Sequence, residues 1–81
     1  MSDAAPAALE QAIRQFVIYE RPADYPDGYV VREWQITPGK AEPGQAWTAA
    51  TLEAARSLLP TGVTLIAGRG QNEPPIVEVW I

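Results

Sequence analysis

Two runs of β-branched and aromatic residues, joined by a connection that contains two prolines, constrain this sequence most strongly. The first run is FVIYE, residues 16–20, and the second is YVVREWQI, residues 29–36. Val, Ile, Tyr, Phe and Trp favour strands, whereas the intervening RPADYPDG is rich in turn-forming residues. The sequence therefore predicts a β-hairpin over residues 16–36.

The turn of this hairpin is expected at residues 25–28. Pro26 presets φ for the second position of a type I turn, and Gly28 accepts the positive φ of a following G1 bulge. Counting outward from this turn gives three cross-strand pairs: Arg21 with Glu33, Tyr19 with Gln35, and Ile18 with Ile36. Opposite charges meet and apolar residues meet in this register, which supports it.

The segment before the hairpin predicts a helix. In SDAAPAALEQAIRQ, residues 2–15, Leu9, Ala12 and Ile13 recur at helical spacing. A frayed N-terminal arm is the alternative, because short Ala-rich helices need a packing partner. Residues 1–15 are therefore expected to form an N-terminal helix or arm.

The second half of the chain predicts a loop, a helix and two strands. TPGKAEPGQAW is expected to be a loop because it contains two Pro-Gly pairs. Residues 51–59 predict an amphipathic helix, which Thr48 or Thr51 can cap and Pro60 ends, with Glu53 and Arg56 on its solvent-exposed side. Residues 63–68 and 76–81 predict the remaining strands.

These elements predict a single α+β domain over residues 1–81. The expected architecture is a four-stranded antiparallel sheet, ββαββ in chain order, with one helix packed on a face and an additional N-terminal helix. Alternation then divides the apolar side chains between two faces. One set is expected to face the helix: Phe16, Ile18, Trp34, Ile36, Val77, Val79 and Ile81. The other set is expected to face away from it: Val17, Tyr19, Tyr29, Val31 and Trp80.

The runs FVIYERPADYPDGYVVREW, ATLEAARSLLPTG and PPIVEVWI resemble a group of small uncharacterised proteins from bacteria and their phages. The resemblance covers residues 16–81. It implies a shared fold without an assigned function, so it implies no catalytic residue.

The composition disfavours several kinds of catalytic group, metal site and partner. The chain contains neither Cys nor His, which leaves no thiolate chemistry, no zinc site and no imidazole base, so we expect neither a metal nor a cofactor. The net charge is −4 and the six basic residues are scattered singly, which disfavours nucleic acid and anionic membranes. No apolar run is long enough for a membrane span, and the acidic N-terminus is unlike a signal peptide, so we expect a cytoplasmic protein.

Local motifs for chemistry are weak. Glu20, Asp24 and Asp27 are close enough for a cation site, but the spacing lacks the alternation of a calcium loop, and a solvated turn is favoured. AGRGQN, residues 67–72, leads to Pro74 rather than to a helix, which favours a hairpin connection over a phosphate loop. Ser57 has no histidine to activate it. A base stacked on Tyr19 and Trp80 is the alternative to ordinary packing of these aromatic side chains.

Two function classes stay open. The first is a non-enzymatic protein–protein interaction module that uses an apolar sheet face or a free edge. The expected occupant of the face Val17, Tyr19, Tyr29, Val31 and Trp80 is a second copy of the chain in a homodimer, with the N-terminal helix or another protein as alternatives. The second class is a small ligand-binding protein or a carboxylate-based enzyme. A cleft lined by two or more acids favours the second class, and a flat apolar face favours the first.

Overall fold

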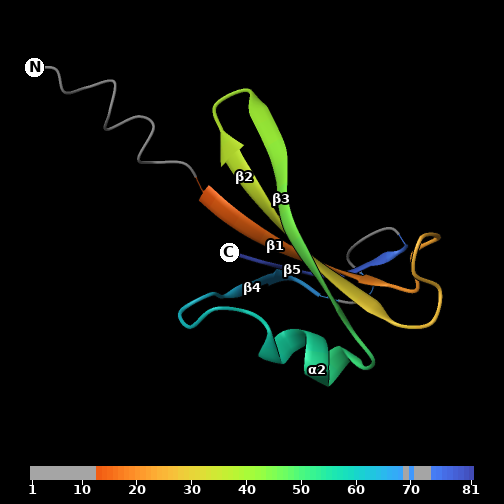
Figure 1. The fold of residues 1–81 in the computed structure, drawn as a ribbon. Coiled ribbons are helices and arrows are strands. Elements are labelled where there is room, and N and C mark those ends of the chain that lie inside the picture. The colour runs from red at the N-terminus through yellow and green to blue at the C-terminus, as the bar shows by residue number, and fades with distance from the viewer. Residues whose placement is uncertain (1–12, 69, 71–73) are drawn as a thin grey trace, which may run out of the picture.

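The computed structural model describes residues 13–68, 70 and 74–81, which form a five-stranded antiparallel sheet with one short helix (Figure 1). The sheet order is β3-β2-β1-β5-β4. The strands are β1 (Ile13–Glu20), β2 (Tyr29–Thr37), β3 (Lys40–Ala49), β4 (Leu65–Ala67) and β5 (Ile76–Trp80), and the helix is α2 (Leu52–Ser57). β1 lies at the centre of the sheet, whereas β3 and β4 are its edges.

The expectation of four strands is wrong, because the segment expected to be a loop after β2 forms β3. This strand has ten residues and pairs with β2 along its length. Gly39, with φ 77°, makes the turn into it. Pro43 is tolerated because β3 is an edge strand, where a missing N–H breaks no ladder on the outer side. Gly44 lies next to Glu33, where the register shifts by a bulge.

The N-terminal helix expected over residues 1–15 is wrong for residues 13–15, which open β1. Residues 1–12 of that prediction lie outside the described residues. The other elements lie where the sequence places them: β1 and β2 are longer than expected, whereas α2, β4 and β5 are shorter. α2 occupies the inner part of the expected range 51–59, and β4 occupies the inner part of 63–68.

The expected hairpin register is also wrong. Tyr19 pairs with Val30 rather than with Gln35, a difference of five positions (35 − 30). Pairing between β1 and β2 ends at Glu20 and Tyr29, which is earlier than expected. The Arg21 amide donates to the Gly28 carbonyl at 2.7 Å, and residues 21–28 form one connection. Side chains alternate along a strand, so an odd shift moves every side chain of β2 to the opposite face.

Gly28 serves a different purpose from the expected bulge. Gly28 does not have a positive φ, whereas Arg21, in the same connection, has a φ of 48°. A Cβ at Gly28 would lie 2.6 Å from the carbonyl oxygen of Ala49 and 2.8 Å from the ring of Tyr25. A glycine is required here because the connection passes directly against β3.

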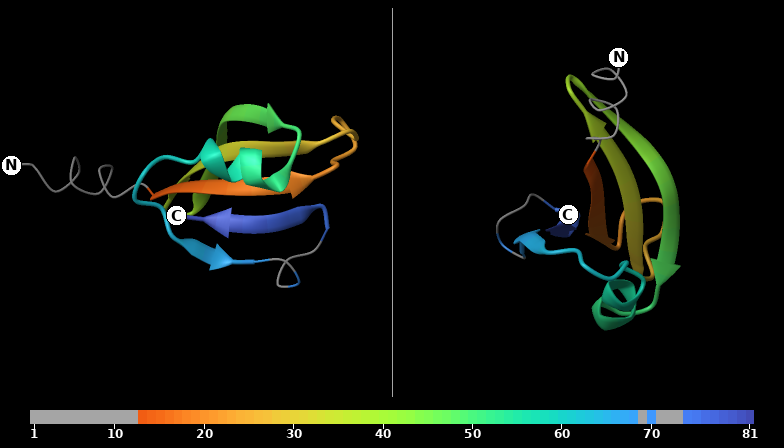
Figure 2. Two further views of the ribbon diagram at one scale, coloured as in Figure 1. Left: turned by 90° about the horizontal axis from the view of Figure 1, so that it is seen from below. Right: turned by 90° about the vertical axis from the view of Figure 1, so that its left-hand side faces the viewer.

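α2 packs on one face of the sheet and closes the core. Thr51 caps it, accepting a hydrogen bond of 3.0 Å from the Ala54 amide through Oγ1. Ala55 is fully buried against Ile18 and Val31. Figure 2 shows α2 in front of β1 and β2, with β5 and β4 running beside it. The other side chains of the core are Val77, Tyr29, Trp47, Ala49, Leu52, Leu59 and Trp80.

Candidate functional site

The observed register divides the five residues of the expected interaction face. Val17 and Tyr19 do face away from α2. Tyr29, Val31 and Trp80 instead lie on the α2 side, where Val31 is fully buried in the core. The interaction face with the membership expected from sequence does not exist, because β2 is turned over relative to the prediction.

A different set of side chains occupies the sheet face away from α2, which we call the open face. No described helix packs on it (Figure 1), although Val17 and Val30 in its middle are only 5% and 9% exposed, so the accessible part lies toward the β2–β3 turn. Cross-strand pairing places four rows of side chains across it, because paired residues point to the same side, and the row of Ile13, Ile36 and Ala41 is wholly apolar. Its members on the first three strands, with their neighbour on β5, are Ile13, Gln15, Val17, Tyr19, Val30, Arg32, Trp34, Ile36, Ala41, Pro43, Ala46, Thr48 and Val79. Trp34, Ile36 and Val79 were expected to face the helix, and the register corrects all three.

The part of the sheet nearest the β2–β3 turn is amphipathic. On its α2 side, Arg14 pairs with Glu33 at 2.7 Å and Lys40 pairs with Glu42 at 2.9 Å. The side chains of Arg14, Lys40 and Glu42 are more than half exposed and that of Glu33 is 13% exposed, which indicates a face largely in contact with water. On its open face, the same strands carry apolar residues: Ile13, Trp34, Ile36, Ala41 and Pro43.

Trp34 is held in place on the open face by a neighbouring strand. Its indole Nε1 donates to the Tyr19 hydroxyl oxygen at 3.3 Å. Both side chains are half-buried, so each keeps part of its ring in contact with solvent. An aromatic side chain that is both fixed and partly exposed is typical of an interface anchor, since it loses little rotamer freedom on binding.

A shallow hollow of about 180 Å³ lies at the other end of the open face. Tyr19, Val30 and Arg32 line it from the strands, and Pro22 and Asp24 line it from the connection 21–28. The Arg32 guanidinium donates to the Gly44 carbonyl at 3.2 Å. Asp24 is the one acid among the described residues that line this hollow, which is smaller than the ~300–1,000 Å³ of typical small-molecule sites.

A second hollow of about 360 Å³ adjoins the end of β1 and the start of β5. Glu20 is the one carboxylate among the described residues that line it, and this side chain accepts a hydrogen bond from the Tyr29 hydroxyl at 3.3 Å. The wall beside it is formed by Arg21, Gly70, Pro74, Pro75, Ile76 and Val77. Among the residues that the structure describes, neither hollow therefore brings two acids together for acid–base chemistry.

The residues that the sequence marked for chemistry do not converge. Glu20 and Asp24 line different hollows, and Ser57 donates its hydroxyl to the Ala54 carbonyl at 2.6 Å, as helix serines commonly do. Of the AGRGQN segment, residues 69, 71 and 72 lie outside the described residues. Within residues 13–68, 70 and 74–81, no group of three or more acids is placed to hold a metal ion.

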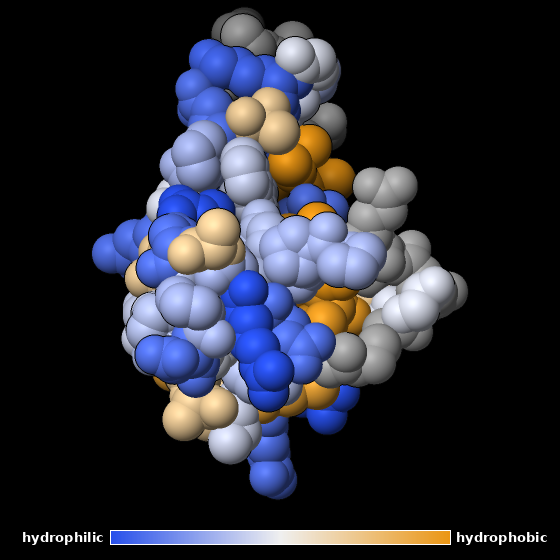
Figure 3. All heavy atoms as spheres, turned by 90° about the vertical axis from the view of Figure 1, so that its right-hand side faces the viewer, coloured by the Kyte–Doolittle hydropathy of each residue, from blue (hydrophilic) through white to orange (hydrophobic). Residues whose placement is uncertain are grey.

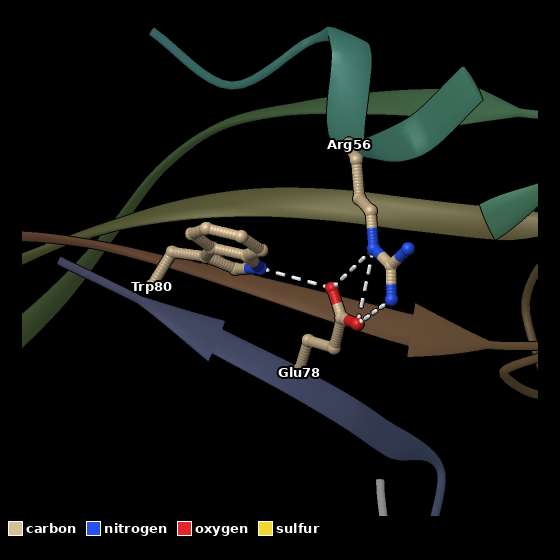
Figure 4. Close-up of polar contacts among 3 residues, drawn as sticks. All are labelled: Arg56, Glu78 and Trp80. Atoms are coloured by element: carbon tan, nitrogen blue, oxygen red, sulfur yellow. Dashed lines mark hydrogen bonds and ion pairs between the residues drawn. The ribbon is translucent and has the colours of Figure 1, made fainter. Parts of the chain in front are cut away.

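The sequence did not predict one polar cluster, which consists of Arg56, Glu78 and Trp80 (Figure 4). Glu78 lies on β5 opposite Ile18, and it is only 3% exposed beneath α2. Its Oε1 accepts from Arg56 Nε at 3.0 Å and from Trp80 Nε1 at 3.0 Å. Its Oε2 accepts a second bond from Arg56, whose NH2 also contacts it. This bidentate pair ties α2 to β5.

The hydrogen bond to Glu78 raises the pKa of the Arg56 guanidinium above its ordinary value, although burial acts in the opposite direction. The arginine therefore stays charged. A signal for this pair was present in the sequence: IVEVWI has one acid among apolar residues, and α2 carries one arginine. We infer a structural role for the cluster, because its polar atoms point at one another rather than into either hollow.

Replacing Arg56 with Ala should lower the free energy of unfolding by about 1–2 kcal/mol. The change leaves the Glu78 carboxylate without its bidentate partner, but Arg56 is half exposed, which lets water compensate in part. Urea unfolding followed by circular dichroism measures the loss. Lys40→Ala is the matched control, since its pair with Glu42 is exposed on both sides and should contribute less than about 0.5 kcal/mol. Equal losses in the two variants would show that the buried pair does not anchor α2.

Exposed apolar side chains also gather at the edge of the sheet that β4 forms. Leu58, Leu65, Ile66 and Ile81 are each about two-fifths to one-half exposed. Figure 3, which views the molecule from the right-hand side of Figure 1, shows hydrophobic side chains reaching the surface between hydrophilic ones, and it does not single out the edge at β4. Single exposed apolar residues are common on soluble proteins, so this edge is a weaker candidate than the open face.

The chain matches no protein-family model, no curated protein and no solved structure. Among the described residues, no helix has the length and apolar character that crossing a bilayer requires.

Proposed function

We propose that this chain is a non-enzymatic binding module that recognises a protein through the open face of its sheet. The observation that carries the proposal is the contrast near the β2–β3 turn, where ion pairs cover one face and apolar side chains the other. A sheet segment with one wet face normally buries its apolar face. The fixed and partly exposed Trp34 supports a role in recognition.

The geometry favours a binding module over a carboxylate enzyme or a small-ligand site. Each hollow contains a single acid among its described lining residues. The open face also carries one cation, Arg32, among its strand positions, which is too little positive charge to track a phosphate backbone. The proposal therefore names a protein or a second copy of the chain as partner, and neither nucleic acid nor membrane.

The proposal also retains two expectations from the sequence. A cytoplasmic location agrees with a chain that has no cysteine to form stabilising disulfides. The resemblance to small bacterial and phage proteins implies no assigned function, so it favours neither a binding domain nor an enzyme.

Two substitutions at adjacent positions on β2 test the proposal. Ile36 lies on the open face and Gln35 on the other, so Ile36→Lys and Gln35→Lys add the same charge to opposite sides. Immobilised wild-type chain and both variants are exposed to lysate of the source cell, and the retained proteins are compared by quantitative mass spectrometry. We expect Ile36→Lys to lose the specific partner at least about tenfold, which corresponds to 1.4 kcal/mol.

Gln35→Lys should retain the partner, and light scattering of the same samples detects self-association. Equal retention by the two variants, together with an oligomeric state that neither substitution changes, would show that the open face is not the binding surface.

A further inference from the structure

The outer edge of β3 is the longest free edge of the sheet. β3 has ten residues, whereas β4, the other edge strand, has three. Within the described residues no strand pairs with the outer side of β3, and in Figure 2 no described helix or strand lies beyond it. An edge strand presents unpaired N–H and C=O groups that can pair with another extended chain.

The two halves of this edge differ in their protection against such pairing. The first half carries Lys40, Glu42 and Pro43 and ends where the register shifts against β2. Charges, prolines and bulges are devices by which edge strands avoid pairing. The second half, residues 45–49, has the sequence QAWTA, without charge, proline or glycine. It is therefore the part of the edge that is open to another strand.

The ladder between β1 and β2 shows which amides of this half point outward. The Arg21 amide donates to the Gly28 carbonyl, so these two residues turn their backbone groups toward each other. Backbone direction alternates along a strand, so Val30, two residues after Gly28, turns its N–H and C=O toward β1 as well. Its neighbour Thr48 on β3 then turns both groups away from β2, and Ala46, two residues earlier, does the same. Thr48 and Ala46 thus offer these groups to the outer edge.

A second copy of the chain presents the complementary set of groups. Antiparallel pairing about a two-fold axis at Trp47 places Ala46 opposite the partner's Thr48, and Thr48 opposite the partner's Ala46. Such pairs exchange both of their N–H···O bonds, so every outward group of the two residues is bonded in both copies. Pro43 then lies opposite the partner's Thr51, past the end of the partner's β3, so its missing N–H removes no bond from the new ladder.

Three features favour a second copy over an unrelated flexible peptide. Both edges are already extended, so neither loses the conformational freedom that a flexible peptide loses on pairing. Trp47 meets its own copy at the axis, on the α2 side of the sheet, where it is only half-buried, and aromatic cross-strand pairs stabilise antiparallel ladders. Residues 45–49 carry no charge, so pairing brings no like charges together although the chain has a net charge of −4.

We propose that the outer edge of β3 is a self-association site, at which residues 45–49 pair antiparallel with the same residues of a second copy. The contact uses the backbone of this edge rather than the side chains of the open face. It makes the two five-stranded sheets continuous, with both open faces on the same side. The interface is small, so we expect a weak dimer whose population rises with concentration.

Amide exchange in the unmodified chain tests this pairing. Exchange of individual amides is followed by NMR at about 50 μM and about 1 mM, with sedimentation equilibrium of the same samples. We expect the mass to rise toward that of a dimer and the Ala46 and Thr48 amides to exchange about threefold more slowly at the higher concentration. Ala41 lies on the same side of β3 and also points its amide outward, but outside the new ladder, so its rate should not change.

Two results of this experiment would contradict the proposal. One is a mass that stays at that of a single chain in both samples. The other is association that leaves the exchange of Ala46 and Thr48 unchanged, because another surface would then hold the two copies together.

Two proline substitutions give a matched pair on β3. Ala46→Pro removes an outward N–H inside the new ladder and Ala41→Pro removes one outside it, so neither removes a bond to β2. We expect Ala46→Pro to stay monomeric and Ala41→Pro to associate as the wild-type chain does, with folding of both checked by circular dichroism. Equal association of the two folded variants would overturn the proposal. The exchange measurement decides the question if Ala46→Pro does not fold.

Ile36→Lys separates this dimer from the proposed function. Ile36 pairs with Ala41, outside residues 45–49, so the dimer should persist in this variant even where the protein partner is lost. Loss of capture with persistence of the dimer supports both proposals. If Ile36→Lys prevents association and Ala46→Pro permits it, the copies meet through their open faces, and the pairing of β3 edges is wrong while the proposed function stands.

Discussion

Val31→Lys should lower the free energy of unfolding by at least about 4 kcal/mol, because it places an ammonium group without a partner in the core beneath α2. Val31 is fully buried and contacts the cluster formed with Ile18 and Ala55. A domain of 81 residues has a total stability of about 4–12 kcal/mol. We therefore expect the variant to be largely unfolded at 25 °C, which circular dichroism and tryptophan fluorescence detect.

Ile36→Lys is the matched control on the same strand. Ile36 is an aliphatic β-branched residue on the open face and is only half-buried, so the lysine can extend its ammonium into water at a cost below about 1 kcal/mol. The reverse order, with Val31→Lys tolerated and Ile36→Lys unfolded, would establish the register that pairs Ile18 with Ile36.

A milder pair keeps this test quantitative if the lysine variant does not fold. Val31→Thr changes shape very little but buries a hydroxyl, which should cost about 1–3 kcal/mol in urea titrations. Ile36→Thr leaves its hydroxyl near solvent and should cost less than that.

Gly28→Ala should lower the free energy of unfolding by about 3 kcal/mol, near the upper end for overpacking of a tight site. The added methyl would lie 2.6 Å from the Ala49 carbonyl oxygen and 2.8 Å from a ring carbon of Tyr25. The ring can rotate away. The carbonyl cannot, because Ala49 pairs with Tyr29 in the ladder between β2 and β3.

Gly39→Asn provides the control for the second glycine-dependent turn. No atom lies within 4 Å of a Cβ at Gly39, and asparagine tolerates its φ of 77° better than other side chains do. We expect a loss below about 1 kcal/mol by the same urea titration. A Gly28→Ala variant as stable as Gly39→Asn would mean that the connection 21–28 does not pass against β3 in solution.

Local signals in the sequence determined where most elements lie. The runs 16–20 and 29–36 are strands because their residues suit a pleated, half-buried surface. α2 begins after Thr51 because this side chain caps the Ala54 amide, and it ends before Pro60 because proline cannot continue it. The antiparallel sheet follows from these segments and their short connections.

Tertiary structure decided the register and therefore both faces. The backbone of the connection 21–28 depends on Arg21 at φ 48° and on the close approach of Gly28 to Ala49, a residue far along the chain. The expected turn at 25–28 was inferred from adjacent residues alone. It gave a register that assigns every side chain of β2 to the wrong face of the sheet. Prediction of the candidate site failed with it, and only Val17 and Tyr19 of the expected face lie on the open face.

Two further features arose from contacts distant in sequence. The segment 40–49 is a strand because β2 offers it a free edge, which outweighs the local preference of its prolines and glycines for a loop. Glu78 is buried because Arg56 of α2 reaches it from the other side of the core, and a lone acid in a strand pattern does not reveal that partner. The sequence by itself thus determined the elements and the absence of thiol and imidazole chemistry. The tertiary structure decided which residues the sheet buries and which it presents, because pairing between strands depends on the path of the loops and on non-local packing.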